Sequence, residues 1–150
     1  MLSRTQPRPA ERPQATLADL QLPIVEAYHE SLPPGGRAAH HGVADRVRGR
    51  QPREALRYAE IGLGRRPLPF ELPGSDLDSR ITAYDVHLGT PQDVIESLRA
   101  DPTLRWATDL VFQVHSVDPP HPLVLRSIEL LATEVAPALG RRPVTESSMK

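Results

Sequence analysis

The sequence lacks cysteine, and this absence excludes several kinds of chemistry. None of its 150 residues can form a disulfide, act as a thiol nucleophile or offer sulfur to a metal. Aromatic residues make up only 4%, lysine occurs once, at Lys150, and no apolar run approaches the ~20 residues of a membrane span. The net charge of −1 argues against a protein that binds nucleic acid or membranes over its whole surface. The N-terminus has no apolar signal segment, so we expect a cytoplasmic protein.

Proline, in contrast, is abundant. The 17 prolines are about 11% of the chain, against a usual frequency near ~5%. A length of 150 residues suits one domain, but a complete eightfold β/α barrel normally takes about 250 residues. The sequence therefore predicts one domain with many proline-bounded elements.

The N-terminal half predicts two helices separated by irregular chain. Thr16 is a candidate N-cap, followed by an apolar face of Leu17, Leu20, Ile24, Tyr28 and Leu32. A second helix is expected from Pro52 to about Leu63, burying Ala55, Leu56, Ala59 and Leu63. Residues 37–51 show neither alternation nor an apolar run, and 64–80 are rich in proline and glycine, so both segments are predicted to be irregular.

The C-terminal half predicts two parallel β/α units, so the fold class is α/β. Strands are expected at 81–87 and 109–115, each followed by a helix, one from Pro91 and one from Pro122 to about Leu139. The first helix is expected to bury Val94, Ile95 and Leu98. The apolar stripe of the second consists of Val124, Leu125, Ile128, Leu131, Ala132, Val135 and Leu139. We expect these strands to be parallel neighbours, joined right-handedly through the 90–100 helix. Residues 140–150 read as a polar tail.

The candidate site residues follow these strands, because ligands of β/α proteins bind beyond the carboxyl ends of parallel strands. His87, His115 and His121 lie on the two loops there. Gly89 and Thr90 precede a helix whose free N–H groups could hold an anion, although a tight turn and an N-cap explain the same two residues.

Three further chemistries receive little support. The three histidines could meet at a metal, but no HExxH-type motif accompanies them, so no metal is assigned. Ser116 lies near a histidine and an aspartate but has no G-x-S-x-G context. Residues 37–66 hold eight arginines against three acids, which fits a solvated face better than a nucleic-acid patch because aromatic residues are scarce there.

The run from His87 to Gly140 resembles the C-terminal end of the luciferase-like, flavin-dependent monooxygenases. Gly89-Thr90-Pro91 followed by Val94, then Pro120-His121, then Pro137-Ala138-Leu139 match motifs of that family in order. Residues 2–33 are similar to the part that follows the fifth barrel strand in one actinobacterial-type subgroup. Together these two stretches cover more than half of the chain.

This resemblance implies a partial TIM-type β/α barrel and a cofactor. Family members bind reduced FMN and use dioxygen to oxygenate an organic substrate, with a flavin reductase as the partner that reduces the flavin. Ser3, Arg4 and Thr5, with Gly89 and Thr90, would contact the cofactor, and His121, His115 and His87 would be the catalytic candidates. The three histidines and residues 3–5 are then expected on one rim of the barrel.

Residues 1–139 would then be the C-terminal portion of such a barrel, without the part before the fifth-strand loop. We therefore expect a truncated enzyme with little or no activity alone, which exposed strand edges could draw into homo-oligomers. The alternative is a non-catalytic α/β module that binds a partner through the arginine-rich middle or the exposed barrel edge.

Overall fold

The structure is a computed structural model of the whole chain. It describes residues 9, 11–12, 15–36, 38–39, 41–47, 52–65, 76–114 and 119–141, with the backbone alone for 41–47 and 52. The statements below concern these residues. The predicted tail at 140–150 lies outside them beyond Arg141.

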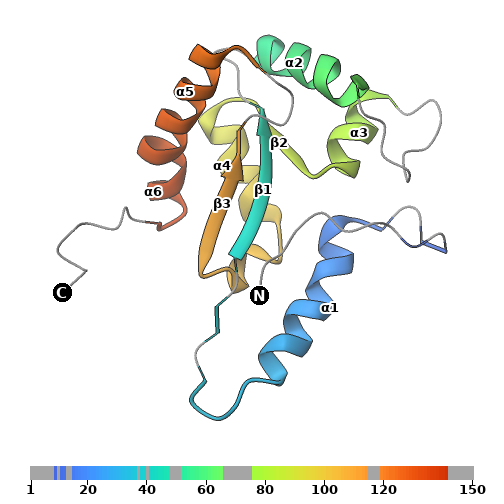
Figure 1. Cartoon of the computed structure of the whole chain (residues 1–150), viewed down its shortest axis with the longest axis vertical. Helices are drawn as coiled ribbons and strands as arrows, with labels where there is room; N and C mark the ends of the chain where they lie inside the picture. Colours follow the sequence, from blue (N-terminus) through green and yellow to red (C-terminus); the bar gives the residue numbers. More distant parts are fainter. Residues whose placement is uncertain are drawn as a thin grey trace.

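Three parallel strands form one sheet, which establishes the α/β class (Figure 1). The strands are β1 (His41–Val47), β2 (Val86–Leu88) and β3 (Asp109–Gln113), in the order β2-β1-β3. Asp45 is level with Val86 on one side and with Gln113 on the other. The central strand is therefore the first in the chain.

The prediction that 37–51 is irregular is wrong for residues 41–47, which form β1. The segment HGVADRV carries no strong strand pattern of its own. Its extended form is stabilised by backbone ladders to β2 and β3 on its two sides. The pattern of apolar and polar residues in 41–47 therefore does not reveal this pairing with distant strands.

The prediction of a strand over 81–87 is also wrong for most of its length. Helix α3 (Leu77–Ala83) occupies the first residues, and β2 begins only at Val86. Asp76 caps α3 by accepting a hydrogen bond from the Ser79 N–H at 2.8 Å. Helical residues 77–80 likewise correct the predicted loop over 64–80, of which 66–75 lie outside the described residues.

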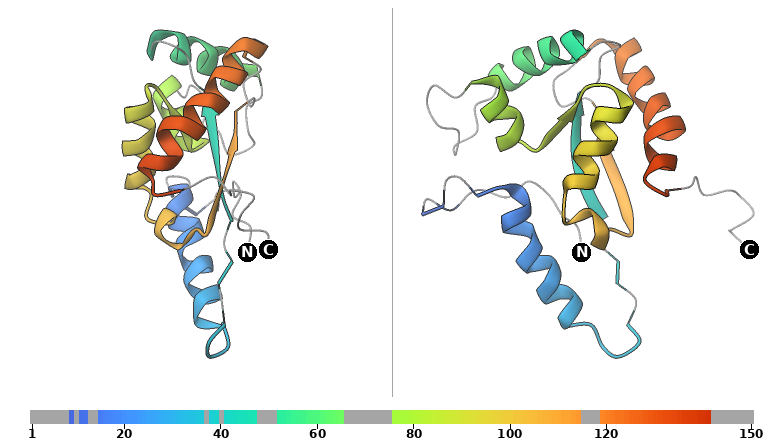
Figure 2. Two further views of the ribbon diagram at one scale, coloured as in Figure 1. Left: turned by 90° about the vertical axis from the view of Figure 1, so that its left-hand side faces the viewer. Right: turned by 180° about the vertical axis from the view of Figure 1, so that it is seen from behind.

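The two predicted C-terminal strands are parallel but are not neighbours, because β1 lies between them. Helix α4 (Pro91–Ala100) connects β2 to β3 across β1. In the right-hand view of Figure 2, α4 lies in front of the sheet and the strands point upward. There β2 lies to the left of β1 and β3 to the right, so the connection is right-handed as expected.

Strand β2 is covered on both faces. Val86 and Leu88 pack with α3 and with α2 (Pro52–Arg65), whereas the His87 ring bonds Ser97 of α4. Side chains of successive strand residues point to opposite faces, so β2 contacts α2 and α3 on one face and α4 on the other. Val111 of β3 is 48% exposed, so the face of β3 away from α4 is not covered by a described helix. The order β2-β1-β3 is typical of an open doubly wound sheet, not of sequential barrel strands.

Helix α4 has the predicted start and buried face. Thr90 is the N-cap and Pro91 the first residue, and Val94, Ile95 and Leu98 are buried. They pack with Val114 and with Leu131 and Val135 of the C-terminal helical region.

That region consists of α5 (His121–Leu130), the π-helical segment η2 (Leu131–Val135) and α6 (Ala136–Ala138). The wide π turn ends just before Pro137, which cannot donate a backbone hydrogen bond. Leu125 and Ile128, predicted to be in the buried stripe, are exposed because the region turns Leu130, Leu131 and Val135 inward.

Helix α1 (Leu17–Glu30) begins at the predicted cap. Thr16 and Asp19 form a reciprocal capping box, in which the Asp19 N–H donates to Thr16 Oγ1 at 3.1 Å. The buried face, however, holds Leu17, Gln21 and Val25, while Ile24 is 49% exposed. In α2 the predicted Ala55, Ala59 and Leu63 are buried and Leu56 is exposed.

Candidate functional site

The carboxyl ends of the strands carry the predicted residues that the structure describes. His87 and Leu88 end β2, Gly89 and Thr90 lead into α4, and His121 begins α5 at the same end of the sheet (Figure 1). Ser3, Arg4, Thr5 and His115, together with Ser116, lie outside the described residues. The predicted gathering of three histidines with residues 3–5 on one rim therefore stays a prediction.

The strand order predicts where a ligand-binding crevice would lie at this end. From β1 the chain moves to β2 on one side, and from β2 it crosses to β3 on the other. Open α/β sheets bind ligands where the direction reverses, outside the carboxyl ends of two such strands. Here the direction reverses between β1 and β3, so the expected crevice is the space beyond Val47 and Gln113.

His87 faces the interior under α4 and does not reach into this crevice. Its side chain is 5% exposed, and its Nδ1 lies 2.7 Å from Ser97 Oγ. Its Nε2 lies 4.0 Å from Asp85 Oδ2, on a residue with a positive φ of 54°. The ring thereby fixes α4 against β2.

A cleft of about 450 Å³ opens beside this histidine. Its walls come from the start of α1, the turn between α3 and β2, and the end of α4. They include Asp19, Asp85, His87, Ser97 and Asp101. The cleft combines an imidazole, a hydroxyl and carboxylates, which can orient a polar ligand through hydrogen bonds.

Ser97, His87 and Asp85 do not form a hydrolase triad. A triad needs the carboxylate hydrogen-bonded to the ring, and 4.0 Å exceeds a hydrogen bond. Sequence reasoning singled out His87 but missed Ser97 and Asp85. Asp85 precedes His87 by two residues, and residues two apart in an extended segment share a face. Ser97 follows the buried Val94 by about one helical turn, so both lie on the face of α4 that packs on the sheet. These two spacings are the sequence signals that point to contacts with His87.

The Asp19 carboxylate in this cleft is already engaged. The side-chain hydrogen bond with Thr16 lowers the pKa of Asp19 below 3.8, with a smaller contribution from the Thr16 backbone N–H. Thr16 N–H donates to Asp19 Oδ2 at 2.8 Å. Asp19 therefore caps α1 as a carboxylate, and its lone pairs are partly used before any ligand arrives.

Gly89 and Thr90 have complete structural explanations in the turn before α4. The Thr90 N–H donates to Asp93 Oδ2 at 2.7 Å, and the Asp93 N–H donates back to Thr90 Oγ1. A phosphate at this helix start would meet the Asp93 carboxylate. These residues do not fit the phosphate of FMN, so their assignment as cofactor contacts stays a prediction without geometric support.

In the part of the chain that the structure describes, no three His, Asp or Glu side chains are grouped to hold a metal ion. None of the described helices is long and apolar enough to cross a bilayer. No protein-family model matches this chain, and no curated protein is significantly similar to it.

Proposed function

We propose that this chain is the C-terminal portion of a luciferase-like, FMN-dependent monooxygenase, a family whose complete members fold as a TIM-type β/α barrel. The observation that carries the proposal is the order of the family motifs on parallel β/α units. The motif Gly89-Thr90-Pro91 lies between β2 and α4, and Pro120-His121 begins α5 after β3.

The order of the described strands differs from that of a TIM-type barrel. A barrel places consecutive strands side by side, whereas β1 separates β2 from β3 here. The α4 start also does not fit the flavin phosphate. We therefore expect this chain alone to bind reduced FMN weakly and to show negligible turnover, since cofactor contacts would have to come from other segments.

Anaerobic titration with reduced FMN tests this proposal. The chain alone should show no micromolar affinity, which corresponds to about −8 kcal/mol. Adding the N-terminal half of a luciferase-like enzyme should restore binding. In that assembly a Ser3→Ala and Thr5→Val double variant should weaken binding, whereas Thr90→Val should change stability and leave affinity unchanged.

Two results would overturn the proposal. Micromolar affinity of the isolated chain would refute the fragment hypothesis, because the contacts would already be present. Failure of the reconstituted assembly to bind any flavin, with both parts folded by circular dichroism, would remove the enzyme assignment.

The second candidate is a non-catalytic α/β interaction module. The observation that favours it is the open sheet, in which β2 and β3 are the outer strands among the described residues. Val111 on β3 is 48% exposed, so part of this sheet offers apolar surface to a partner. If neither the isolated chain nor its assembly with a luciferase-like N-terminal half binds flavin, the interaction module becomes the favoured function.

A further inference from the structure

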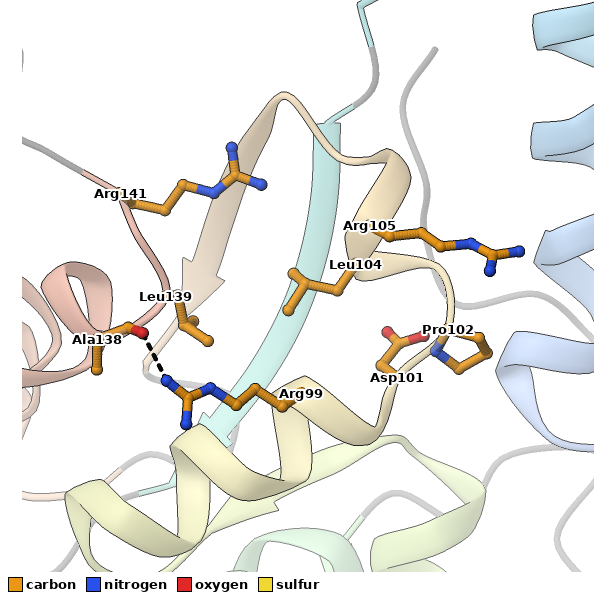
Figure 3. Close-up of a pocket in the computed structure, with 8 residues that line it drawn as sticks. All are labelled: Arg99, Asp101, Pro102, Leu104, Arg105, Ala138, Leu139 and Arg141. Atoms are coloured by element: carbon orange, nitrogen blue, oxygen red, sulfur yellow. Dashed lines mark hydrogen bonds between the residues drawn. The ribbon is translucent and has the colours of Figure 1, made fainter.

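A groove lined by three arginines lies at the other end of the sheet from Gly89 and Thr90 (Figure 3). It has a volume of about 440 Å³. Its walls come from the end of α4, from the short 3₁₀ helix η1 (Leu104–Trp106) and from the chain after α6. The arginines are Arg99, Arg105 and Arg141.

Backbone carbonyls hold two of the three guanidinium groups in place. Arg99 Nη2 donates to the Ala138 carbonyl at 2.8 Å, and Arg141 donates to the carbonyls of Thr108 and Ala107. Arg105 lies 5.2 Å from the ring centre of Trp106. The Arg99 and Arg141 side chains, already fixed by these hydrogen bonds, lose less conformational entropy when a ligand binds.

The position of Arg141 follows from how α6 ends. Gly140 has a φ of 72°, its N–H donates to the Pro137 carbonyl, and the Arg141 N–H donates to the Ala136 carbonyl. These two bonds form a Schellman motif, which fixes the direction of the chain after the helix. Arg141 is thereby directed across the link between η1 and β3.

The charge of the groove is not neutralised among the described residues. Three lining residues are cationic and one, Asp101, is anionic. The Asp101 carboxylate accepts hydrogen bonds from the N–H and hydroxyl of Thr103, and none of the three arginines pairs with a carboxylate in the described part of the chain. Backbone carbonyls carry only partial negative charge, so a net positive potential remains.

The shape of the groove indicates the kind of ligand. Leu104 and Leu139, both half-buried, lie between the arginines, whose guanidinium groups point in different directions (Figure 3). A single phosphate could not reach all three. An extended ligand with spaced carboxylates and apolar groups between them matches the charges and the surface together.

We propose that this groove binds an acidic segment of a partner protein in which glutamate or aspartate side chains alternate with apolar ones. The carboxylates would pair with Arg99, Arg105 and Arg141, and the apolar side chains would cover Leu104 and Leu139. This inference concerns a surface separate from the flavin proposal and does not depend on it.

The test uses a fluorescein-labelled peptide of alternating glutamate and leucine, titrated with the full chain and followed by anisotropy. Trp106, the one tryptophan of the chain, contacts Arg105 and gives a second signal from its own fluorescence. Arg99→Gln and Arg105→Gln should each weaken binding by about tenfold, as expected for loss of a charge-assisted hydrogen bond. Arg53→Gln, an exposed charge on α2, is the matched control and should bind like the wild type.

Raising the salt from about 0.1 M to about 1 M, which shortens the Debye length from about 10 Å to about 3 Å, should weaken binding in the wild type. Equal binding of a glutamine–leucine peptide would overturn the proposal, as would unchanged affinity in Arg99→Gln and Arg105→Gln. Displacement of the peptide by inorganic phosphate at matched ionic strength would also overturn it, because the groove would then be a small-anion site.

Discussion

Gly89 shows most directly how one residue constrains the chain at the predicted site. Its φ is 124°, and a Cβ built there would lie 2.6 Å from Asp93 Oδ2. Both the backbone conformation and the capping carboxylate therefore favour glycine at this position. The structure accounts for Gly89 without a cofactor.

Replacing Gly89 with alanine should lower the free energy of unfolding by about 1–3 kcal/mol, because backbone strain and the contact with Asp93 both oppose the new methyl group. Gly140→Ala is the matched control. Its φ is also positive at 72°, but nothing lies within 4 Å of its added Cβ, so it should cost less. Urea unfolding followed by circular dichroism measures both, and equal costs would contradict the steric argument.

At the scale of elements, the starts of α1 and α4 are also fixed by residues close together in the sequence. Thr16 and Thr90 each form a reciprocal capping box with the aspartate three residues later. In α1 the stabilising partner is the ionised Asp19, whose pKa is lowered mainly by the Thr16 hydroxyl. The cap therefore depends on pH.

Because folding lowers the pKa of Asp19 below 3.8, its contribution is fully present above the unfolded pKa. It is lost as the pH falls through the folded pKa, so α1 should fray in acid. Thr16→Ala should raise the Asp19 pKa towards 3.8, measured by NMR titration of the carboxyl carbon. Asp76, whose pKa is lowered by Ser79, should not respond to this variant. An unchanged Asp19 pKa would show that the hydroxyl is not the cause.

Two separate apolar clusters form the core of the part of the chain that the structure describes. One joins α4 to β3 and to the C-terminal helical region around Leu98, and the other joins α2, α3 and β2 around Leu63. Leu98→Ala and Leu63→Ala should each cost about 2–5 kcal/mol. Their costs should add within about 0.5 kcal/mol, since the clusters share no residue.

Urea unfolding of the single and double variants measures this additivity. Leu125→Ala, at a site 54% exposed, should stay within about 0.5 kcal/mol of the wild type. Leu98→Val and Leu63→Val replace the alanine variants if these do not fold. A large coupling between the two leucines would show that the clusters form one core.

The order of the strands can be tested in solution with introduced cysteines. Because the chain has no cysteine of its own, only the introduced pair can form a disulfide. Gln113 and Asp45 are register partners on adjacent strands, whereas Val86 is level with Asp45 on the far side of β1. A D45C/Q113C pair should form a disulfide on mild oxidation, because adjacent strands lie about 4.8 Å apart. A V86C/Q113C pair, about twice as far apart, should stay reduced.

Mass spectrometry of the oxidised variants without reductant reads out both pairs. The reverse result would be a disulfide in V86C/Q113C and none in D45C/Q113C. It would place β2 beside β3, which is the consecutive strand order of a barrel. It would also remove the topological argument for the crevice beyond β1 and β3.

The sequence by itself determined the features that depend on neighbours within one or two turns. The starts of α1 and α4 and the buried face of Val94, Ile95 and Leu98 were predicted correctly. Caps and helical faces involve residues three or four apart, so their chemistry is visible in the sequence. The α/β class followed from the same local patterns.

Only the tertiary structure decided which strand is central, which helical faces are buried and what surrounds His87. Strand β1 is fixed by partners about 40 to 70 residues away, and Ile24 and Leu125 are exposed although each has the spacing of a buried stripe. The Ser97 hydroxyl reaches His87 only because α4 folds back over β2. Such contacts depend on chain segments meeting in space, and the local periodicity of a sequence does not encode which segments meet.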